Sequence, residues 1–313
     1  MVGMVIMRKI LTIYSFNNPN HYNRRLHYDF ISKLSNWSEH KIILKKDIKN
    51  INKLYSDFKP DVIIQYAQRY FEAGHRNHLN LPNFPCLKVL ILVDAHKTKK
   101  KKFDQKFAYI NSYDLVVQRG VYTDKRIRCP SVWLPFSADI NIFTPMEYDK
   151  KVNKIGFAGT SNSYIYEQRR KAISVLNADN LLVYQKNGSR ITGDAYPKFL
   201  RNYTGCLTST ELDSPHAKTF EIMASGSVLL TSPFYGEKEL FGENCFVKYA
   251  SDCSDIVKKA KWIIDNPDES KEIINNAYKI FKERHTDTIR AKELFLTIRG
   301  LLTGKGLVKR WGR

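Results

Sequence analysis

Short apolar runs alternate with segments of helical periodicity along the first half of the chain. The apolar runs predict strands at residues 8–16, 41–45, 61–67, 87–94, 114–118 and 131–135. Amphipathic segments between them predict helices at residues 21–35, 51–58 and 103–110. The runs at 61–67 and 87–94 are continuously apolar, which is typical of parallel strands buried on both faces. Strands joined by crossover helices predict a doubly wound α/β domain, in which ligands bind beyond the carboxyl ends of the strands.

A second alternating series follows a polar segment. Residues 139–152 contain proline and lack periodicity, so we interpret them as a linker. Downstream we predict strands at 153–160, 181–185, 205–210, 228–230 and 245–250, and helices at 164–177 and 195–203. Helical periodicity continues over 252–302 and is broken at Asn266 and Pro267. The length of 313 residues also favours two domains. We therefore predict Rossmann-like domains at 1–140 and 153–285, facing each other across a cleft, and a carboxyl-terminal helix with a basic tail at 286–313 that packs on the first domain.

The segment DSPHAKTFEIMASGSVLL, residues 213–230, is the most informative part of the sequence. Asp213 precedes Glu221 by eight positions, and a run of small residues and then an apolar run follow Glu221. This order predicts a loop, a helix, a tight turn and a buried strand. The amino terminus of such a helix favours an anion such as a diphosphate, and a carboxylate one or two turns later can reach the hydroxyls of an attached ribose. The sequence thus predicts a nucleotide site, although Asp213 also suits an ordinary turn.

Other polar residues lie where a doubly wound fold presents side chains to ligands. Asp94 and His96 follow the strand predicted at 87–94, and His96 is suited to deprotonate an acceptor hydroxyl. The alternative is a capping Asp94 beside a solvated His96. His216 is suited to contact donor phosphate or sugar, or else is a loop residue without such a role. Arg169 is a candidate phosphate ligand, or else forms a surface salt bridge.

The chain is strongly basic, with 51 Lys and Arg against 31 Asp and Glu and a formal net charge of +20. This charge attracts polyanions such as nucleic acid, an anionic membrane or a phosphate-rich substrate, whereas dispersed lysines that solvate the surface are the simpler explanation. Residues 95–128 concentrate the charge, with ten Lys or Arg against three Asp. The candidate acceptor-binding residues there are Lys99, Lys100, Lys101 and Lys102. Trp311, in the basic tail, suits either a membrane interface or a solvated terminus.

Other features bear on the compartment and on metal binding. The sequence has no apolar run long enough to cross a membrane, and its first residues lack the pattern of a signal peptide. The five cysteines are widely spaced, which argues against a zinc site and favours a reducing compartment. No clear Asp-x-Asp motif follows a predicted strand, so a metal-chelated diphosphate is not required. We predict a cytoplasmic protein without a metal site, with peripheral association at the inner membrane face as a further hypothesis.

Two blocks of sequence carry a resemblance to a known family. One is KTFEIMASGSVLLTSPFYGEKELFGENCFVKYASD at 218–252, with a basic residue, Phe-Glu, a small-residue turn and an apolar strand. The other is LVDAHKTKKKKFDQKFAYINSYDLVVQ at 92–118, followed by VWLPFSADINIFTP at 132–145. Together they resemble the CgeB-like (spore-maturation-protein-like) branch of the GT-B glycosyltransferases. The resemblance implies a GT-B fold and sugar transfer from a nucleotide-sugar without a metal.

The same resemblance implies roles for individual residues. In retaining GT-B enzymes two acidic residues separated by seven others contact the donor, and Asp213 and Glu221 have this spacing, with Asp where Glu is usual. By this resemblance Glu221 binds the ribose hydroxyls, and either Asp213 or nearby Glu211 contacts the transferred sugar. Lys218 neutralises the leaving diphosphate. The resemblance implies further donor-binding residues at Gly159, Thr160, Ser161 and Thr219.

We therefore predict a glycosyltransferase that moves a hexosyl or pentosyl group from a nucleotide-sugar, with a UDP-sugar favoured as co-substrate. The charge favours a polyanionic acceptor, either a cell-envelope glycan or a lipid-linked intermediate at an anionic membrane. One alternative is a phage-type enzyme that glycosylates hydroxymethylated pyrimidines in DNA, where the charge would serve phosphate contacts. A second alternative is a non-catalytic GT-B-like module that binds a sugar-nucleotide or a polyanion, which Asp213 in place of Glu favours.

Overall fold

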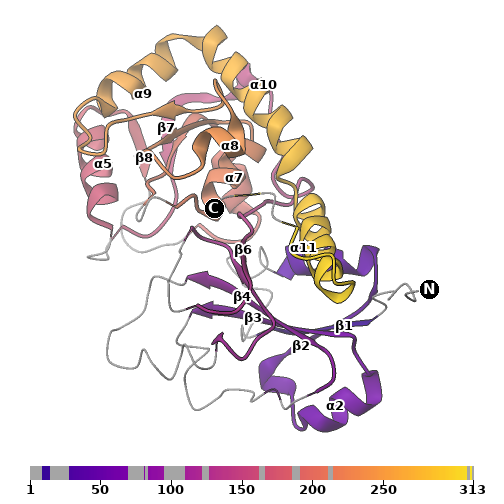
Figure 1. The fold of residues 1–313 in the computed structure, drawn as a ribbon. Coiled ribbons are helices and arrows are strands. Elements are labelled where there is room, and N and C mark those ends of the chain that lie inside the picture. The colour runs from indigo at the N-terminus through magenta and orange to yellow at the C-terminus, as the bar shows by residue number, and fades with distance from the viewer. Residues whose placement is uncertain are drawn as a thin grey trace. The chain divides into compact units, whose positions relative to one another are not determined.

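The computed structural model describes residues 9–14, 28–69, 81, 84–94, 110–121, 127–161, 166–184, 191–210, 214–308 and 311. These residues form two compact units, each with its own parallel sheet (Figure 1). The described residues up to Pro135 form the first unit together with Arg290–Arg313, and Phe136–Ile289 form the second. The predicted architecture of two doubly wound α/β domains is confirmed.

The first unit contains a six-stranded parallel sheet. Its strands are β1 (Lys9–Tyr14), β2 (Glu39–Leu44), β3 (Val62–Arg69), β4 (Leu87–Asp94), β5 (Leu115–Gln118) and β6 (Ser131–Trp133), in the order β2-β1-β3-β4-β5-β6. Its named helical elements that precede β6 are η1 (Lys33–Asn36), η2 (Lys45–Asp47) and α2 (Ile51–Phe58). All five strand pairs are parallel, as the continuous apolar runs predict.

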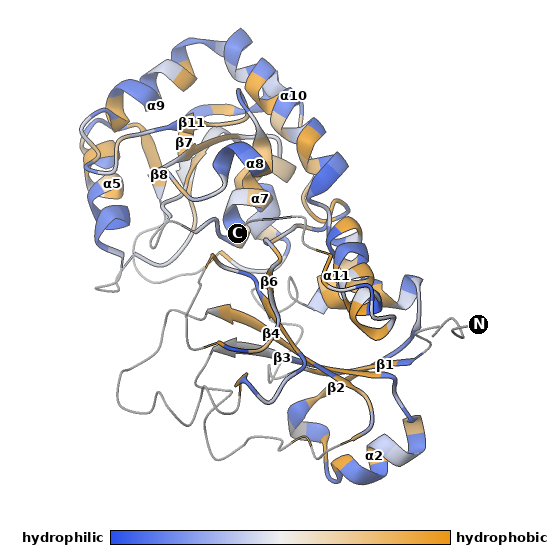
Figure 2. Cartoon of the chain, in the orientation of Figure 1, coloured by the Kyte–Doolittle hydropathy of each residue, from blue (hydrophilic) through white to orange (hydrophobic). Residues whose placement is uncertain are grey.

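Local chemistry explains these elements. The central strands are mostly apolar (Figure 2), and Ile13 and Ile63 are completely buried. Helix α2 begins at Asn50, whose side chain accepts a hydrogen bond from the Lys53 amide at 3.0 Å. The helix ends at Lys59, which has the left-handed conformation that terminates many helices. The boundaries of α2 therefore follow from capping residues that the sequence shows.

The second unit contains a five-stranded parallel sheet in the order β11-β10-β9-β7-β8. Its strands are β7 (Val152–Phe157), β8 (Leu182–Tyr184), β9 (Tyr203–Leu207), β10 (Val228–Thr231) and β11 (Val247–Lys248). Its helical elements are η4 (Tyr148–Lys150), α5 (Glu167–Ala178), α6 (Ala195–Arg201), α7 (Ala217–Ala224), α8 (Glu237–Phe241), α9 (Ile256–Asp265) and α10 (Pro267–Arg284). Helix α9 packs on the sheet beside α5, while α10 packs against α7. Completely buried residues such as Ile155, Val228 and Ile263 fill the core.

The carboxyl-terminal helical region has two breaks, although the sequence predicts only one. The predicted break at Asn266 and Pro267 separates α9 from α10. A second break at His285 separates α10 from α11 (Asp287–Leu302). There the backbone of Thr286 forms a bridge with Ala138, and the buried imidazole of His285 lies 2.8 Å from the carbonyl oxygen of Leu240. Contacts with residues distant in the sequence thus interrupt the helical region at His285. The local periodicity of the sequence does not reveal this break.

The segment 139–152, which we interpret from sequence as a linker, lies within the second unit. Phe143 is completely buried, and Asp139 orders its own loop by accepting a hydrogen bond from the amide of Asn141 at 2.8 Å. Gly226 packs directly on this segment, since a Cβ there would lie 2.5 Å from Cβ of Pro145. Tertiary contacts, not local periodicity, therefore order these residues.

Trp311 is buried in the first unit, in contrast to the membrane-interface and solvated-terminus interpretations of the basic tail. Its side chain is 5% exposed, and its Nε1 donates a hydrogen bond to Oε2 of Glu293 on α11 at 3.1 Å. The Arg290 guanidinium carbon lies 5.1 Å from the centroid of the Trp311 ring. No described helix is both long and apolar enough to cross a bilayer. The Trp311 side chain therefore packs against α11 and anchors its own segment to this helix.

We expect Trp311→Ala to lower the free energy of unfolding by about 3 kcal/mol, because it removes a buried aromatic ring and leaves Glu293 without this hydrogen bond. Urea denaturation monitored by circular dichroism measures the change. Val308→Ala is the control, since the Val308 side chain is 51% exposed and its truncation should cost about 0.5 kcal/mol or less. Equal stabilities of the two variants would show that Trp311 does not hold the tail.

Candidate functional site

The strand order of the second sheet shows where a doubly wound domain binds a ligand. From β7 the chain crosses to β8 at the edge and then continues at β9, on the other side of β7. Ligands of such sheets bind at this reversal, beyond the carboxyl ends of the two strands. The segments at that point are residues 158–161 after β7 and residues 208–210 after β9. The predicted donor-binding residues Gly159, Thr160 and Ser161 all lie in the first of these segments.

Lys218 lies in the first turn of α7 and reaches the end of β7. Its Nζ donates a hydrogen bond to the carbonyl oxygen of Ala158. The same nitrogen lies 4.6 Å from the centroid of the Phe157 ring, which favours a cation electrostatically. Gly159 leaves room for the ammonium group, since a Cβ at this position would lie 2.5 Å from Nζ. Contacts to Phe157 and Ala158, and the space beside Gly159, thus place the ammonium group of Lys218 at the carboxyl end of β7.

Arg169 lies in the first turn of α5 and is largely buried. Its Nε donates a hydrogen bond to Oγ of Ser209 at 3.1 Å, and its Nη1 donates one to the carbonyl oxygen of Thr160 at 2.9 Å. The guanidinium carbon lies 4.1 Å from the centroid of the Tyr166 ring. Arg169 therefore connects the segments after β7 and β9, and brings a second positive charge near Lys218.

Glu221 lies one turn after Lys218 on α7, and only 2% of it is exposed. Its Oε2 accepts a hydrogen bond of 2.6 Å from Oη of Tyr196 on α6. Within the described part of the chain, its Oε1 accepts no hydrogen bond. The protein thus occupies one oxygen of this carboxylate and leaves the other for a ligand.

We call Lys218, Arg169 and Glu221 the switch-point cluster, because they lie where the strand order reverses beside β7. Burial is the main cause of the pKa shifts of Lys218 and Glu221. Burial lowers the pKa of Lys218 and the nearby Arg169 guanidinium lowers it further, while Glu221 opposes both. Burial raises the pKa of the Glu221 carboxyl, against the hydrogen bond from Tyr196 and the charge of Lys218. Within this cluster, burial thus favours the neutral form of the carboxyl group, beside two basic side chains. The cluster is electrostatically suited to an anion.

The remaining described candidates lie on the same loops and helix. Oγ of Ser161 lies 2.5 Å from Oη of Tyr184 at the end of β8. His216 is half-buried at the cap position before α7, where its carbonyl oxygen accepts a hydrogen bond from the Thr219 amide at 3.0 Å. Thr219 is completely buried, and its Oγ1 has no hydrogen-bond partner among the described residues. Ser161 and Thr219 are therefore enclosed, whereas His216 is partly accessible.

Several candidates from the sequence lie outside the described residues. These are Glu211, Asp213, His96, Lys99, Lys100, Lys101 and Lys102. Asp94 is described only as the last residue of β4, in register with Arg69 of β3. Within the described ranges, no three His, Cys, Asp or Glu side chains are arranged to hold a metal ion. The predicted base and acceptor-binding residues therefore stay predictions.

The structure adds three residues that sequence reasoning missed, namely Tyr196, Ser209 and Phe157. Each contacts a predicted residue. Tyr196 donates a hydrogen bond to Glu221, and Ser209 accepts one from Arg169. The Phe157 ring lies next to the ammonium group of Lys218. Ser209 and Phe157 lie in the carboxyl-terminal halves of the strands predicted at 205–210 and 153–160, and this position toward the ligand-binding edge is a usable signal for the site. Tyr196 lies on a predicted helix, where no pattern in the sequence connects it to Glu221.

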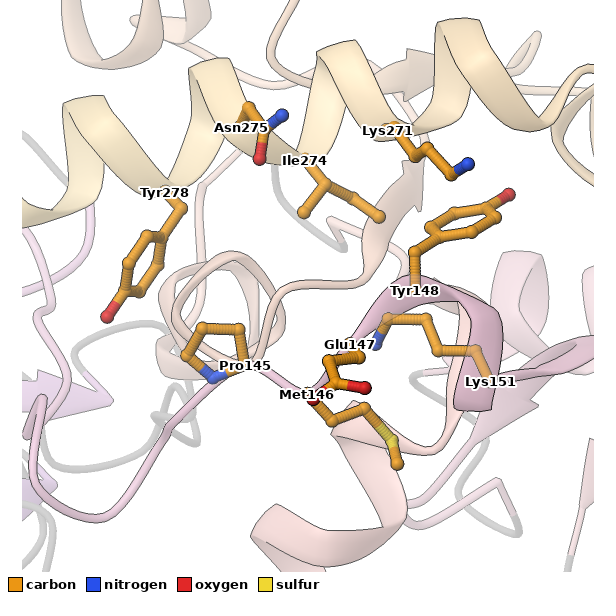
Figure 3. A pocket seen from close by; sticks show the side chains of 9 residues that line it. All are labelled: Pro145, Met146, Glu147, Tyr148, Lys151, Lys271, Ile274, Asn275 and Tyr278. Atoms are coloured by element: carbon orange, nitrogen blue, oxygen red, sulfur yellow. The ribbon is translucent and has the colours of Figure 1, made fainter.

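A hollow of about 320 Å³ lies elsewhere in the second unit (Figure 3). Its lining residues are Pro145, Met146, Glu147, Tyr148, Lys151, Lys271, Ile274, Asn275 and Tyr278. Both lysines of the hollow have partners within the protein. Lys151 donates a hydrogen bond to the carbonyl oxygen of Arg201 at the end of α6. Lys271 forms an ion pair with Asp149 at 3.6 Å. The hollow contains no member of the switch-point cluster, so we place the candidate site at the cluster.

Comparison with known protein families identifies a match over most of the second unit and the start of α11. Residues 154–295, which include the whole switch-point cluster, match the family model described as glycosyl transferase-like. No curated protein sequence matches the chain.

Solved structures with the same fold match almost the whole chain. Sucrose-phosphate synthase from Thermosynechococcus elongatus is 9% identical with a TM-score of 0.67, over 95% of this chain and all of that chain. HepE from Anabaena in complex with UDP-glucose is 12% identical with a TM-score of 0.64, over 95% and 99%. An alpha-glucosyltransferase in complex with UDP-glucose and DNA containing an abasic site is 10% identical with a TM-score of 0.60, over 93% and 99%. The fold is GT-B, and the predicted enzyme class of glycosyltransferase is confirmed.

Proposed function

We propose that the second unit binds a nucleotide-sugar donor at the switch-point cluster. Lys218 and Arg169 contact the diphosphate, and Glu221 accepts hydrogen bonds from the ribose hydroxyls. The observation that carries this proposal is the position of two basic side chains, half-buried Lys218 and buried Arg169, near the buried carboxyl group of Glu221 at the carboxyl ends of β7 and β9. A diphosphate would accept charge-assisted hydrogen bonds from both basic side chains.

A UDP-sugar is the proposed donor, and no metal is proposed for the step. Two solved structures with this fold are complexes with UDP-glucose, which supports a uridine nucleotide without identifying the sugar. In the transfer, the bond between the anomeric carbon and the phosphate oxygen breaks, and its electron pair goes to the diphosphate. The acceptor oxygen bonds to the anomeric carbon and gives its proton to a base, for which His96 is the candidate. Lys218 stabilises the charge that develops on the leaving diphosphate.

A polyanionic acceptor is the second part of the proposal, and the sequence supports it through charge alone. Lys99 to Lys102 follow closely on Asp94 and His96, so acceptor and base would lie near each other. An envelope glycan or a lipid-linked intermediate at an anionic membrane fits this charge. Transfer rates that are insensitive both to salt and to neutralisation of these lysines would contradict this part.

A thermal-shift panel of nucleoside diphosphates and UDP-sugars tests the donor. A ligand that binds the native state raises the melting temperature, by an amount that grows with its concentration over Kd. We expect UDP and one UDP-sugar to stabilise the protein more than UMP, because UMP lacks the second phosphate. Equal stabilisation by UMP and UDP, or no response to any nucleotide, would contradict the proposed site.

The donor affinity should fall as the pH rises through neutrality. Burial and Arg169 lower the pKa of Lys218, so the free protein loses this charge at a lower pH than an ordinary lysine does. Because the diphosphate binds the charged form, Kd for UDP should rise by up to about tenfold per pH unit above the lowered pKa of Lys218. Calorimetric titrations from about pH 6 to about pH 9 measure this slope. A slope that persists in Lys218→Ala would assign it to another group.

Glycosylation of DNA is the alternative acceptor chemistry. The net charge of +20 and the fold shared with an enzyme solved on DNA favour it. Duplex affinity should then weaken steeply with salt, because each phosphate contact releases counterions. Binding to anionic liposomes without binding to duplex DNA would decide against this alternative.

A further inference from the structure

We propose that Tyr196 is a positioning residue for the donor, because it holds the Glu221 carboxylate in the orientation that receives the ribose. This proposal rests on the proposed donor site and deepens it. The carrying contact is the hydrogen bond of 2.6 Å from Oη of Tyr196 to Oε2 of Glu221, with both residues buried. A bond of this length from a neutral donor to a carboxylate is in the strong, charge-assisted class.

The surroundings of Tyr196 keep its hydroxyl in place. The residue is 7% exposed and lies at the start of α6, where its amide donates to the carbonyl oxygen of Gly193 at 3.2 Å. The completely buried ring of Phe143 contacts the tyrosine ring edge to face, with centroids 6.2 Å apart and an interplanar angle of 90°. Packing thus restricts the ring, so the hydroxyl presents a fixed donor to α7.

Because of this hydrogen bond, the two oxygens of the Glu221 carboxylate have different roles. Tyr196 occupies Oε2, and Oε1 accepts no hydrogen bond in the described part of the chain. The bond also lowers the pKa of Glu221 and so opposes the effect of burial. Without Tyr196 the carboxyl group would be free to rotate and would bind a proton more readily. Both changes weaken its ability to accept hydrogen bonds from the ribose hydroxyls.

A purely structural role is the competing explanation, in which the carboxylate only satisfies a buried hydroxyl. Such a role predicts lower stability in Tyr196→Phe but no change in how the protein distinguishes ribose from deoxyribose. Tyr249→Phe is a matched control, because Tyr249 is 1% exposed and donates to the carbonyl oxygen of Thr208 at 3.2 Å in the same unit. It loses a buried tyrosine hydroxyl without touching Glu221.

The experiment measures Kd for UDP and for 2′-deoxyuridine diphosphate by calorimetry across pH, in wild type and both variants. We expect Tyr196→Phe to weaken UDP binding roughly 10- to 100-fold at neutral pH, the effect of a lost hydrogen bond to a charged group. Its preference for UDP over the deoxy analogue should shrink, and the pH below which UDP affinity declines should move upward. Tyr249→Phe should match wild type in all three measurements.

The outcomes separate this inference from the proposed function. If wild type binds UDP and Tyr196→Phe behaves like Tyr249→Phe, the positioning role is wrong and the donor site stands. If Tyr196→Phe loses affinity equally for both nucleotides with an unchanged pH profile, the role is structural and the inference is again overturned. If wild type binds neither nucleotide, the donor site itself is wrong and this inference is wrong with it.

Discussion

Replacing Lys218 by alanine should reduce kcat/KM for the nucleotide-sugar roughly 100- to 1000-fold, because the variant lacks the cation that stabilises charge on the leaving diphosphate. Part of the loss should appear in KM, since Lys218 also attracts the diphosphate in the ground state. The unliganded variant should be no less stable than wild type, because burial and repulsion from Arg169 together disfavour the Lys218 charge more than Glu221 favours it. Steady-state kinetics and thermal denaturation together measure these effects.

Lys258→Ala is the matched control for Lys218→Ala. Lys258 lies exposed on α9 of the same unit, so its removal lowers the net charge by the same amount without touching the cluster. We expect it to keep kcat/KM within about threefold of wild type. If the two variants lost activity equally, the effect would come from net charge, and the specific role of Lys218 would be wrong.

Gly159→Ala should produce the second large loss of activity. A Cβ at this position would lie 2.5 Å from Nζ of Lys218 and 3.3 Å from Cζ of Phe157. The ammonium group ends a flexible side chain, so it should move away and leave the end of β7. We expect kcat/KM to fall roughly 100-fold, close to the effect of removing the lysine charge itself.

A double-mutant cycle shows whether Gly159 acts through Lys218. Adding Gly159→Ala to Lys218→Ala should cost little further activity, because the alanine side chain at 218 leaves the space that the new Cβ needs. Kinetics of the two single variants and the double variant give the coupling. Additive losses would mean that Gly159 contributes by itself, for example by bringing its backbone N–H close to a phosphate.

Some features of the switch-point cluster can be predicted from the sequence, and others cannot. The order of loop, helix, small-residue turn and strand around Glu221 is local, so it could be predicted, and so could the loop after β7 with Gly159. Arg169 was a candidate through its place one turn into a predicted helix. Tyr196 was not predicted, because its role depends on how α6 packs against α7. The buried state of Glu221 also escaped prediction, since a carboxylate in a first or second turn usually lies exposed.

The sequence by itself determined the two doubly wound domains, because apolar runs and helical periodicity are properties of neighbouring residues. It also determined the chemical groups available at the switch point. Only the tertiary structure decided which of these groups meet, that Trp311 is buried, and that His285 interrupts the last helices. Those outcomes depend on contacts between residues that are distant in the chain. The charges of Lys218 and Glu221 depend in turn on burial and on each other, which only the packed fold creates.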